Sequence, residues 1–214
     1  MIHRIFVDSA FKAIKNNINY NVCQLFNSTN FSTNTVINAT SSTVTVTNFT
    51  HSAQAVLADQ KVPLEDNPED MTFILPSVPY YSIMDPSTTP GLPWTQALTA
   101  GMKTAEKVRD TGIMPVAFGT SIRLDQQMPT TGAVGSRTFT GALFHRWAVA
   151  GVSRPLPAPD SNVMFERVQF GDLELRVMMQ YNLYPKDAWI VNIDCGYGLS
   201  VVRDNMGVLF SIAE

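Results

Sequence analysis

The chain has 214 residues, of which 45% are hydrophobic and only 15% charged, and its formal net charge is −3. This length suits one domain or two modest lobes. The charged share is low against the roughly one quarter typical of globular proteins, as expected if other protein covers much of the surface. The lack of a basic block argues against a nucleic-acid footprint. No apolar run reaches the ~20 residues that span a bilayer, and the N-terminus lacks the apolar core of a signal peptide.

The cysteines and histidines predict neither a disulfide framework nor a metal cluster. Cys23 and Cys195 lie far apart, and neither belongs to a Cys-x-x-Cys pair. We expect two reduced, partly buried thiols in a cytosolic protein. The three histidines, His3, His51 and His145, are too few and too scattered to hold a metal ion.

A long helix is predicted for residues 7–26. Its apolar residues recur at steps of three and four, which places them on one face that we expect to be buried: Val7, Phe11, Ile14, Ile18, Val22 and Leu25. The following segment, residues 27–50, is rich in Asn, Ser and Thr, which compete with helix by bonding to nearby backbone. Within it, residues 42–49 alternate polar and β-branched side chains, and this pattern predicts a strand.

The same Asn-rich segment contains four Asn-x-Ser/Thr sequons. They begin at Asn27, Asn30, Asn38 and Asn48. A glycosylated, secreted surface protein is therefore an alternative. The missing signal peptide argues against it, and such a composition produces sequons by chance.

The middle of the chain predicts short elements. In order, these are a helix over residues 51–61 that stops before Pro63, an acidic loop, a buried strand (71–76), a helix (77–84), a loop (85–93), a helix (94–110) and strands broken at Gly119 (113–128). Thr50 or Ser52 is the expected cap of the first helix and Ser77 of the second, with Pro79 in its first turn.

The acidic loop raises the question of a cation site. It contains Glu65, Asp66, Glu69 and Asp70. Their spacing does not match the alternating ligands, central glycine and terminal glutamate of a calcium-binding EF-hand loop. We interpret the segment as a solvated loop.

The last third of the chain predicts mostly strands. These are residues 164–169 and 173–181, paired as a hairpin across 170–172, then 189–194, and two strands in 199–212 with a turn at Asp204–Asn205. A lone Gly-x-Gly at Gly196 and Gly198 follows a strand, but no amphipathic helix follows it, as a phosphate-binding loop requires. We interpret it as a glycine turn.

One short segment, Gly141–Pro157, places His145 and Arg146 beside Trp147 in apolar sequence. Unpaired polar groups are costly to bury, so the pair needs a partner. One interpretation is a general base with an anion clamp, which requires a carboxylate or nucleophile from elsewhere in the fold. The other is a strand over 141–146 followed by a short helix over 147–152, with the polar pair at the junction. The motifs of common catalytic and nucleotide-binding sites are absent, so we predict no catalytic, cofactor-binding or metal-binding residues.

The order of several segments is more informative than any one of them. They are VDSAFKAIKNNINYNVCQLF, SAQAVLADQKVP with MTFILPSVPYYSIM, GTSIRLDQQMP, GALFHRWAVAGVSRPLP and the tail from Leu173. In this order they resemble the major capsid (coat) proteins of tailed double-stranded-DNA bacteriophages. The first segment is similar to the long spine helix of that family. The Phe-His-Arg step is similar to its strand-to-helix junction, which implies that His145 and Arg146 are scaffold or subunit-contact residues.

The resemblance implies an α+β fold of the tailed-phage and herpesvirus capsid type, with a spine helix, a peripheral lobe and an axial lobe. The expected division is residues 1–49 (spine helix and following strand) and 156–190 (β-hairpin) in the peripheral lobe, and 50–155 and the closing strands 191–214 in the axial lobe. Family members usually carry an N-terminal arm and a long β-hairpin, the extended loop, before the spine helix. Because this chain begins almost at that helix, we expect both parts to be lacking, in a fragment, a truncated copy or a reduced relative.

The implied function is structural rather than enzymatic. The chain is expected to assemble with itself into pentamers and hexamers of an icosahedral shell that encloses DNA without sequence-specific binding. Scaffolding, portal or decoration proteins are further expected partners, no membrane is involved, and the expected location is the virion, with the host cytoplasm during assembly. The alternatives are an encapsulin-like compartment shell, an enzyme with a dispersed site on an α+β fold, and the secreted adhesin considered above.

Overall fold

A computed structural model of the chain describes residues 2–39, 44–64, 70–85, 116–159, 163–170, 173–183 and 188–214. Contacts divide the chain into two compact units. We call Met1–Asn16 with Ala150–Ser200 the hairpin unit, and Asn17–Val149 with Val201–Glu214 the core unit. These units and the expected lobes draw their boundaries differently at residues 17–49, 150–155 and 191–200.

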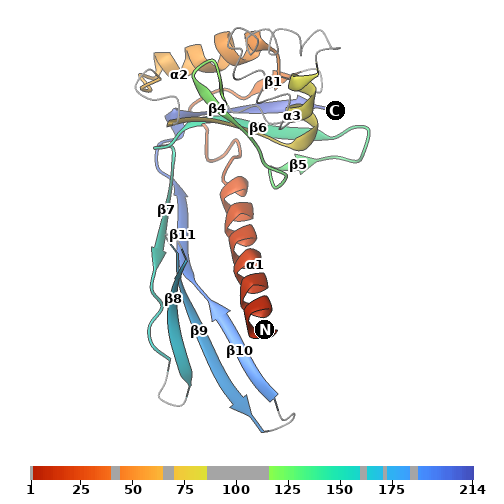
Figure 1. Ribbon diagram of the computed structural model, residues 1–214. Coiled ribbons are helices and arrows are strands. Elements are labelled where there is room, and N and C mark those ends of the chain that lie inside the picture. The colour runs from red at the N-terminus through yellow and green to blue at the C-terminus, as the bar shows by residue number, and fades with distance from the viewer. Residues whose placement is uncertain are drawn as a thin grey trace. The chain divides into compact units, whose positions relative to one another are not determined.

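Within the described residues, the core unit is built on a seven-stranded mixed sheet with the order β1-β12-β6-β2-β4-β3, to which β5 adds beside β6 (Figure 1). The strands are β1 (Ile37–Ala39), β2 (Met71–Leu75), β3 (Val116–Ala117), β4 (Thr120–Leu124), β5 (Thr130–Thr131), β6 (Thr138–His145) and β12 (Gly207–Ala213). β1 pairs with β12 and β2 with β4 in parallel, and the other pairs are antiparallel.

The hydrophobic core of this unit lies on its central strands. β2 alternates buried and half-buried side chains, whereas β12 buries almost every side chain, as expected for a strand covered on both faces. Phe73 of β2 links the core across the sheet, because its ring centroid lies 5.1 Å from that of Phe49 and 5.2 Å from that of Phe210.

Among the described residues, the helices are short apart from the first. They are α1 (Ile2–Gln24), the π-helical segment η1 (Asn48–Gln54) continued by α2 (Ala55–Asp59), α3 (Ser77–Met84) and the 3-10 turn η3 (Asp204–Met206). α1 confirms the predicted long helix but begins earlier. The residues predicted to form its apolar face are less exposed than most of their neighbours, but they are not fully buried as expected: Ile14, Ile18 and Val22 are only half-buried.

The hairpin unit contains the antiparallel sheet β10-β9-β8 and the two-stranded pair β11-β7. The strands are β7 (Val149–Arg154), β8 (Met164–Phe170), β9 (Leu173–Asn182), β10 (Ala188–Asp194) and β11 (Gly196–Val201). Phe170 is opposite Leu173, which confirms the predicted hairpin, and Tyr181 is opposite Trp189.

Several local predictions are confirmed. The strands around Gly119 are joined by Phe118 and Gly119, both at positive φ (50° and 69°), a two-residue turn of the kind that connects hairpins. The final pair of strands is separated by η3 at the predicted turn. After α1, the side chain of Asn27 accepts hydrogen bonds from the backbone N–H of Thr29 and Asn30 and donates one to the carbonyl of Gln24. This sequon asparagine therefore holds the turn that ends the helix.

The strand predicted over residues 42–49 is wrong throughout its described part: residues 44 and 45 lie in no strand, and the chain is helical from Val46 onward. The physical reason is a cap. The hydroxyl of Thr45 accepts a hydrogen bond from the N–H of Asn48 at 3.1 Å, and its carbonyl accepts one from Phe49 at 3.0 Å. A capped first turn outweighs the strand preference of the β-branched residues. Because the helix begins before them, Thr50 and Ser52 are not its caps.

Ser77 is not an N-cap either. Pro76 occupies that position with extended backbone, and its carbonyl accepts a hydrogen bond from the N–H of Tyr80 at 3.0 Å. Pro79 lies in the first turn as predicted.

The helix predicted over residues 147–152 is wrong, because Val149–Arg154 is strand β7. Gly151 disfavours helix, and the valines at 149 and 152 favour the ladder that β7 forms with β11. The expected glycine turn at Gly196 and Gly198 is also wrong, since both residues lie within β11. The predicted helix over 94–110 lies outside the described residues, as does the loop over 85–93 apart from Asp85.

Candidate assembly surfaces

His145 ends β6 and is 1% exposed. Its Nδ1 accepts a hydrogen bond from the backbone N–H of Trp147 at 3.3 Å, so the neutral ring carries its proton on Nε2. The rings of His145 and Trp147 meet edge to face with centroids 4.9 Å apart. The histidine thus supports the tryptophan from beneath.

Arg146 is paired with Asp70, which supplies the partner that a charged side chain in apolar sequence requires. Its Nη1 lies 3.0 Å from Oδ1 of Asp70, and its backbone N–H donates to the carbonyl of the same residue at 2.9 Å. The Asp70 side chain is 14% exposed, so its interpretation as part of a solvated loop is wrong. Glu65, Asp66 and Glu69 lie outside the described residues.

The turn after His145 carries an exposed aromatic ring with two cations close to it. Trp147 is 48% exposed. The guanidinium carbons of Arg146 and Arg203 lie 5.9 and 5.6 Å from the centroid of its ring. The carbonyl of the buried Ala148 accepts hydrogen bonds from the N–H of Val202 and Arg203. We call Trp147, Val202, Arg146 and Arg203, with His145 beneath them, the Trp147 corner.

A second surface is one face of the sheet β10-β9-β8. Because side chains alternate along a strand, the register places eleven described residues on this face: Leu173, Leu175, Val177, Met179, Tyr181, Trp189, Val191, Ile193, Met164, Glu166 and Val168. We call it the apolar face. Glu166 is the only charged residue among these described members.

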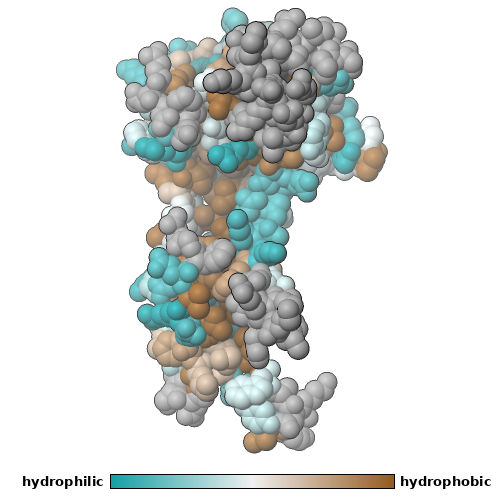
Figure 2. Space-filling view, in the orientation of Figure 1, coloured by the Kyte–Doolittle hydropathy of each residue, from teal (hydrophilic) through white to brown (hydrophobic). Residues whose placement is uncertain are grey.

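Burial changes along the apolar face. Leu175 is 1% exposed, whereas Met164, Tyr181, Trp189 and Val191 are largely exposed. The Tyr181 and Trp189 rings contact each other, with centroids 5.2 Å apart, and both residues are exposed to solvent. Figure 2 shows hydrophobic surface gathered over the strands of this unit, around β8. Contiguous exposed apolar surface of this kind is typical of interaction sites on proteins.

The charged residues on the opposite face of this sheet are paired with one another. Arg176 binds Asp194 through two hydrogen bonds, of 3.0 and 2.7 Å, and donates a third to the carbonyl of Pro157. The hydrogen bonds to Asp194 raise the pKa of Arg176 above its ordinary value. Nε of Arg167 lies 3.6 Å from Oε1 of Glu174. These charges need no external partner.

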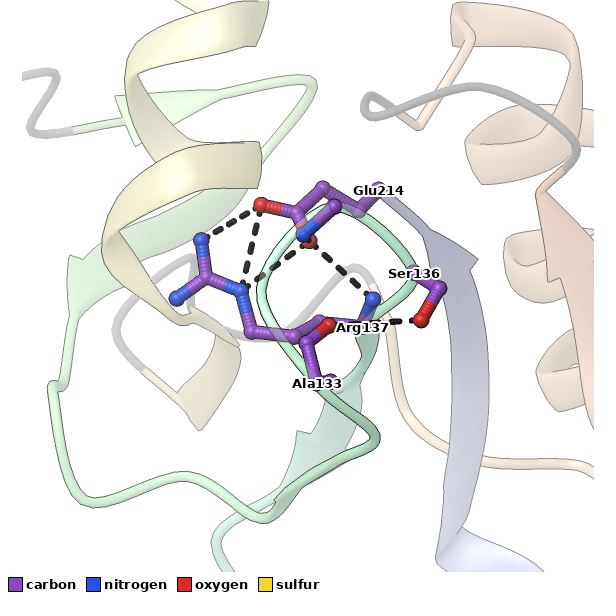
Figure 3. A network of polar contacts seen from close by, with 5 residues as sticks. Ala133, Ser136, Arg137 and Glu214 are labelled. Atoms are coloured by element: carbon purple, nitrogen blue, oxygen red, sulfur yellow. Dashed lines mark hydrogen bonds and ion pairs between the residues drawn. The ribbon is translucent and has the colours of Figure 1, made fainter.

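The end of β12 is tied to the loop before β6 by Arg137 and Glu214 (Figure 3). The carboxylate of Glu214 accepts hydrogen bonds from Nε of Arg137 at 3.1 Å and from the backbone N–H of Gly135 at 2.7 Å. The Arg137 side chain is the main cause that lowers the pKa of Glu214 to about 2. The network ties the loop before β6 to the residue that follows β12.

Gly196 and Gly198 line an open groove of about 590 Å³ beside β7, together with Arg154, Leu156 and Tyr197. A Cβ atom at Gly196 would lie 2.9 Å from the carbonyl oxygen of Arg154, so this glycine permits the close approach of the chain there. A strand glycine of this kind does not form a phosphate-binding loop.

The two cysteines are free thiols. Burial and the neighbouring Asp125 raise the pKa of Cys23 to about 12, and burial also raises the pKa of Cys195. Neither thiol therefore has the lowered pKa of a reactive nucleophile. Within the described ranges, no three His, Cys, Asp or Glu side chains gather in a way that suits a metal ion. No described helix combines the length and apolarity needed to cross a membrane.

Comparison with known proteins gives a structural neighbour and no sequence relative. The sequence matches no protein-family model and no curated protein. The structure is similar to a solved structure from Mycobacterium phage Che8, with a TM-score of 0.57 and 15% sequence identity over 96% of this chain. The match spans 61% of the length of that structure. The chain therefore has a mixed α+β fold that it shares with a phage protein.

Proposed function

We propose that this chain is a capsid protein, a structural subunit that assembles with copies of itself into the shell of a bacteriophage. The observation that carries the proposal is the apolar face. Soluble proteins that remain monomeric rarely expose tryptophan, tyrosine, methionine and valine side chains together on one side of a sheet. A shell subunit buries such a face in every contact with its neighbours, and repeated contacts of modest strength add up in a closed assembly.

Two further observations support the proposal. The fold is shared with a phage protein over nearly the whole chain. His145 is buried, and Arg146 is paired with Asp70, so the polar pair serves the architecture of a turn rather than a solvent-accessible reaction site. In this proposal the subunit forms rings in the host cytoplasm, encloses DNA without reading its sequence, and works beside scaffolding, portal or decoration proteins.

The test is the native mass of the purified protein, by light scattering and negative-stain microscopy. We expect rings or megadalton particles. Val191→Ser removes an exposed side chain from the apolar face and should reduce assembly strongly. Ile190→Ser is the matched control, because Ile190 is its neighbour in β10, is 50% exposed against 47% for Val191, and lies on the opposite face.

Three outcomes contradict the proposal. One is a monomer at all concentrations, including when any upstream coding sequence is restored. Another is equal assembly of the two serine variants. The third is the presence of enzyme or peptide cargo in place of DNA within particles made in the native host, which would indicate a compartment shell instead.

A further inference from the structure

The Trp147 corner has the composition and rigidity of a binding hot spot. Tryptophan and arginine are the residues most enriched among side chains that dominate binding energy. Here the turn that carries them is held by backbone hydrogen bonds from Ala148 to the carbonyl of His145, and from Val202 and Arg203 to Ala148. An exposed ring on a fixed turn loses little conformational entropy when a partner covers it.

Of the two positive charges of the corner, only one is paired with a carboxylate. Arg146 is neutralised by Asp70. Arg203 has no carboxylate at ion-pair distance among the described residues. The corner therefore presents exposed Trp147 and Val202 next to one positive charge, and it is complementary to an apolar surface that carries one carboxylate.

The apolar face of this chain has that chemistry. It carries Glu166, which is exposed and lies in the edge strand β8, two residues from the exposed Met164 and opposite the half-buried Val177. The Glu166 side chain forms no ion pair with another described residue. A nucleic acid is a weaker candidate, because the chain carries a net charge of −3 and the corner offers one unpaired cation.

We propose that the Trp147 corner of one copy docks on the apolar face of the next copy, with Arg203 paired to Glu166. This inference rests on the assembly function proposed above. The two surfaces differ, so the contact is heterologous and repeats from copy to copy. Such contacts generate rings where the rotation closes, as the pentamers and hexamers of a shell require.

The experiment is a charge exchange, followed by native mass and by thermal unfolding of each variant. Arg203→Glu and Glu166→Arg should each lower the yield of assembled particles by roughly tenfold or more, because each places like charges in one contact. The double variant, with both changes, should restore assembly. Arg123→Glu is the control: it reverses another exposed arginine, on β4 and away from any tryptophan contact that the structure shows, and should leave assembly unchanged.

The outcomes separate this inference from the proposed function. If the wild type assembles and both single variants assemble equally well, the docking is overturned while the capsid function stands. If the single variants fold with unchanged thermal midpoints, fail to assemble and are not rescued by the double change, the pairing of Arg203 with Glu166 is wrong. If Arg203→Glu instead abolishes binding of a labelled DNA duplex with assembly intact, the corner is a polyanion contact. A wild type that never assembles overturns both proposals.

Discussion

Arg146 and Asp70 become neighbours through the register of two strands that are far apart in the sequence. Met71 of β2 is opposite His145 of β6 in an antiparallel pair, so the residue before Met71 faces the residue after His145. The sequence shows that Arg146 needs a partner but cannot name it. The identity of the partner depends on pairing, which a local pattern does not encode.

His145 is expected to contribute to stability through burial and through its contacts with Trp147. His145→Ala removes the ring that supports Trp147 and leaves a cavity, so it should lower the free energy of unfolding by about 2 kcal/mol. Denaturant unfolding measures this. Arg146→Ala should change it by less than about 1 kcal/mol, since the Arg146 side chain of that ion pair is largely exposed. Equal effects of the two variants would show that burial of His145 is not the source of its contribution.

Local patterns predicted those elements whose pairing is local. The hairpin of β8 and β9 and the turn at Gly119 each depend on residues close in sequence, and each is confirmed. The buried strand β2 is also confirmed, although its partners β4 and β6 lie far along the chain, because its apolar run by itself indicates a buried strand. The prediction for β7 failed because its partner strand, β11, is separated from it in sequence by β8, β9 and β10. For the surfaces, alternation in the tail already indicated strands, but only the register shows that Trp189 and Tyr181 share a face.

The helix at Val46 tests whether a single cap decides between helix and strand. Thr45→Ala removes the hydroxyl that accepts the N–H of Asn48 and should cost about 1 kcal/mol of unfolding free energy. Thr45→Ser keeps the hydroxyl and should cost much less. Urea unfolding of both variants, followed by circular dichroism, gives the two values. If serine and alanine are equally destabilising, the cap does not account for the helix.

The tie between β12 and the loop before β6 predicts a pH dependence. Glu214 has a folded pKa of about 2 against an ordinary value of 4.5, so its contribution to stability is fully present above pH 4.5 and is lost as the pH falls toward 2. Glu214→Gln should remove this part of the acid sensitivity. Thermal midpoints of the wild type and the variant, measured from pH 7 to pH 2, should therefore converge at low pH. A constant difference across the range would contradict the ion pair.

The two units differ in how much core they possess. In the core unit, β12 buries Val208, Leu209, Phe210 and Ile212. In the described part of the hairpin unit, Leu175 is the one side chain that is fully buried. A sheet with so little buried apolar area gains little stability from its own packing. Its stability should therefore depend on the contacts that assembly supplies.

Hydrogen exchange can measure that dependence. In dissociated subunits, the amides of β8, β9 and β10 should exchange much faster than those of β6 and β12, because local opening exposes little apolar surface there. In assembled particles the same three strands should become protected, while β6 and β12 change little. Val191→Ser should abolish the gain in protection, and Ile190→Ser should retain it. If the three strands are already as protected as β12 in the lone subunit, the unit is stable by itself and its open face does not require a neighbouring copy.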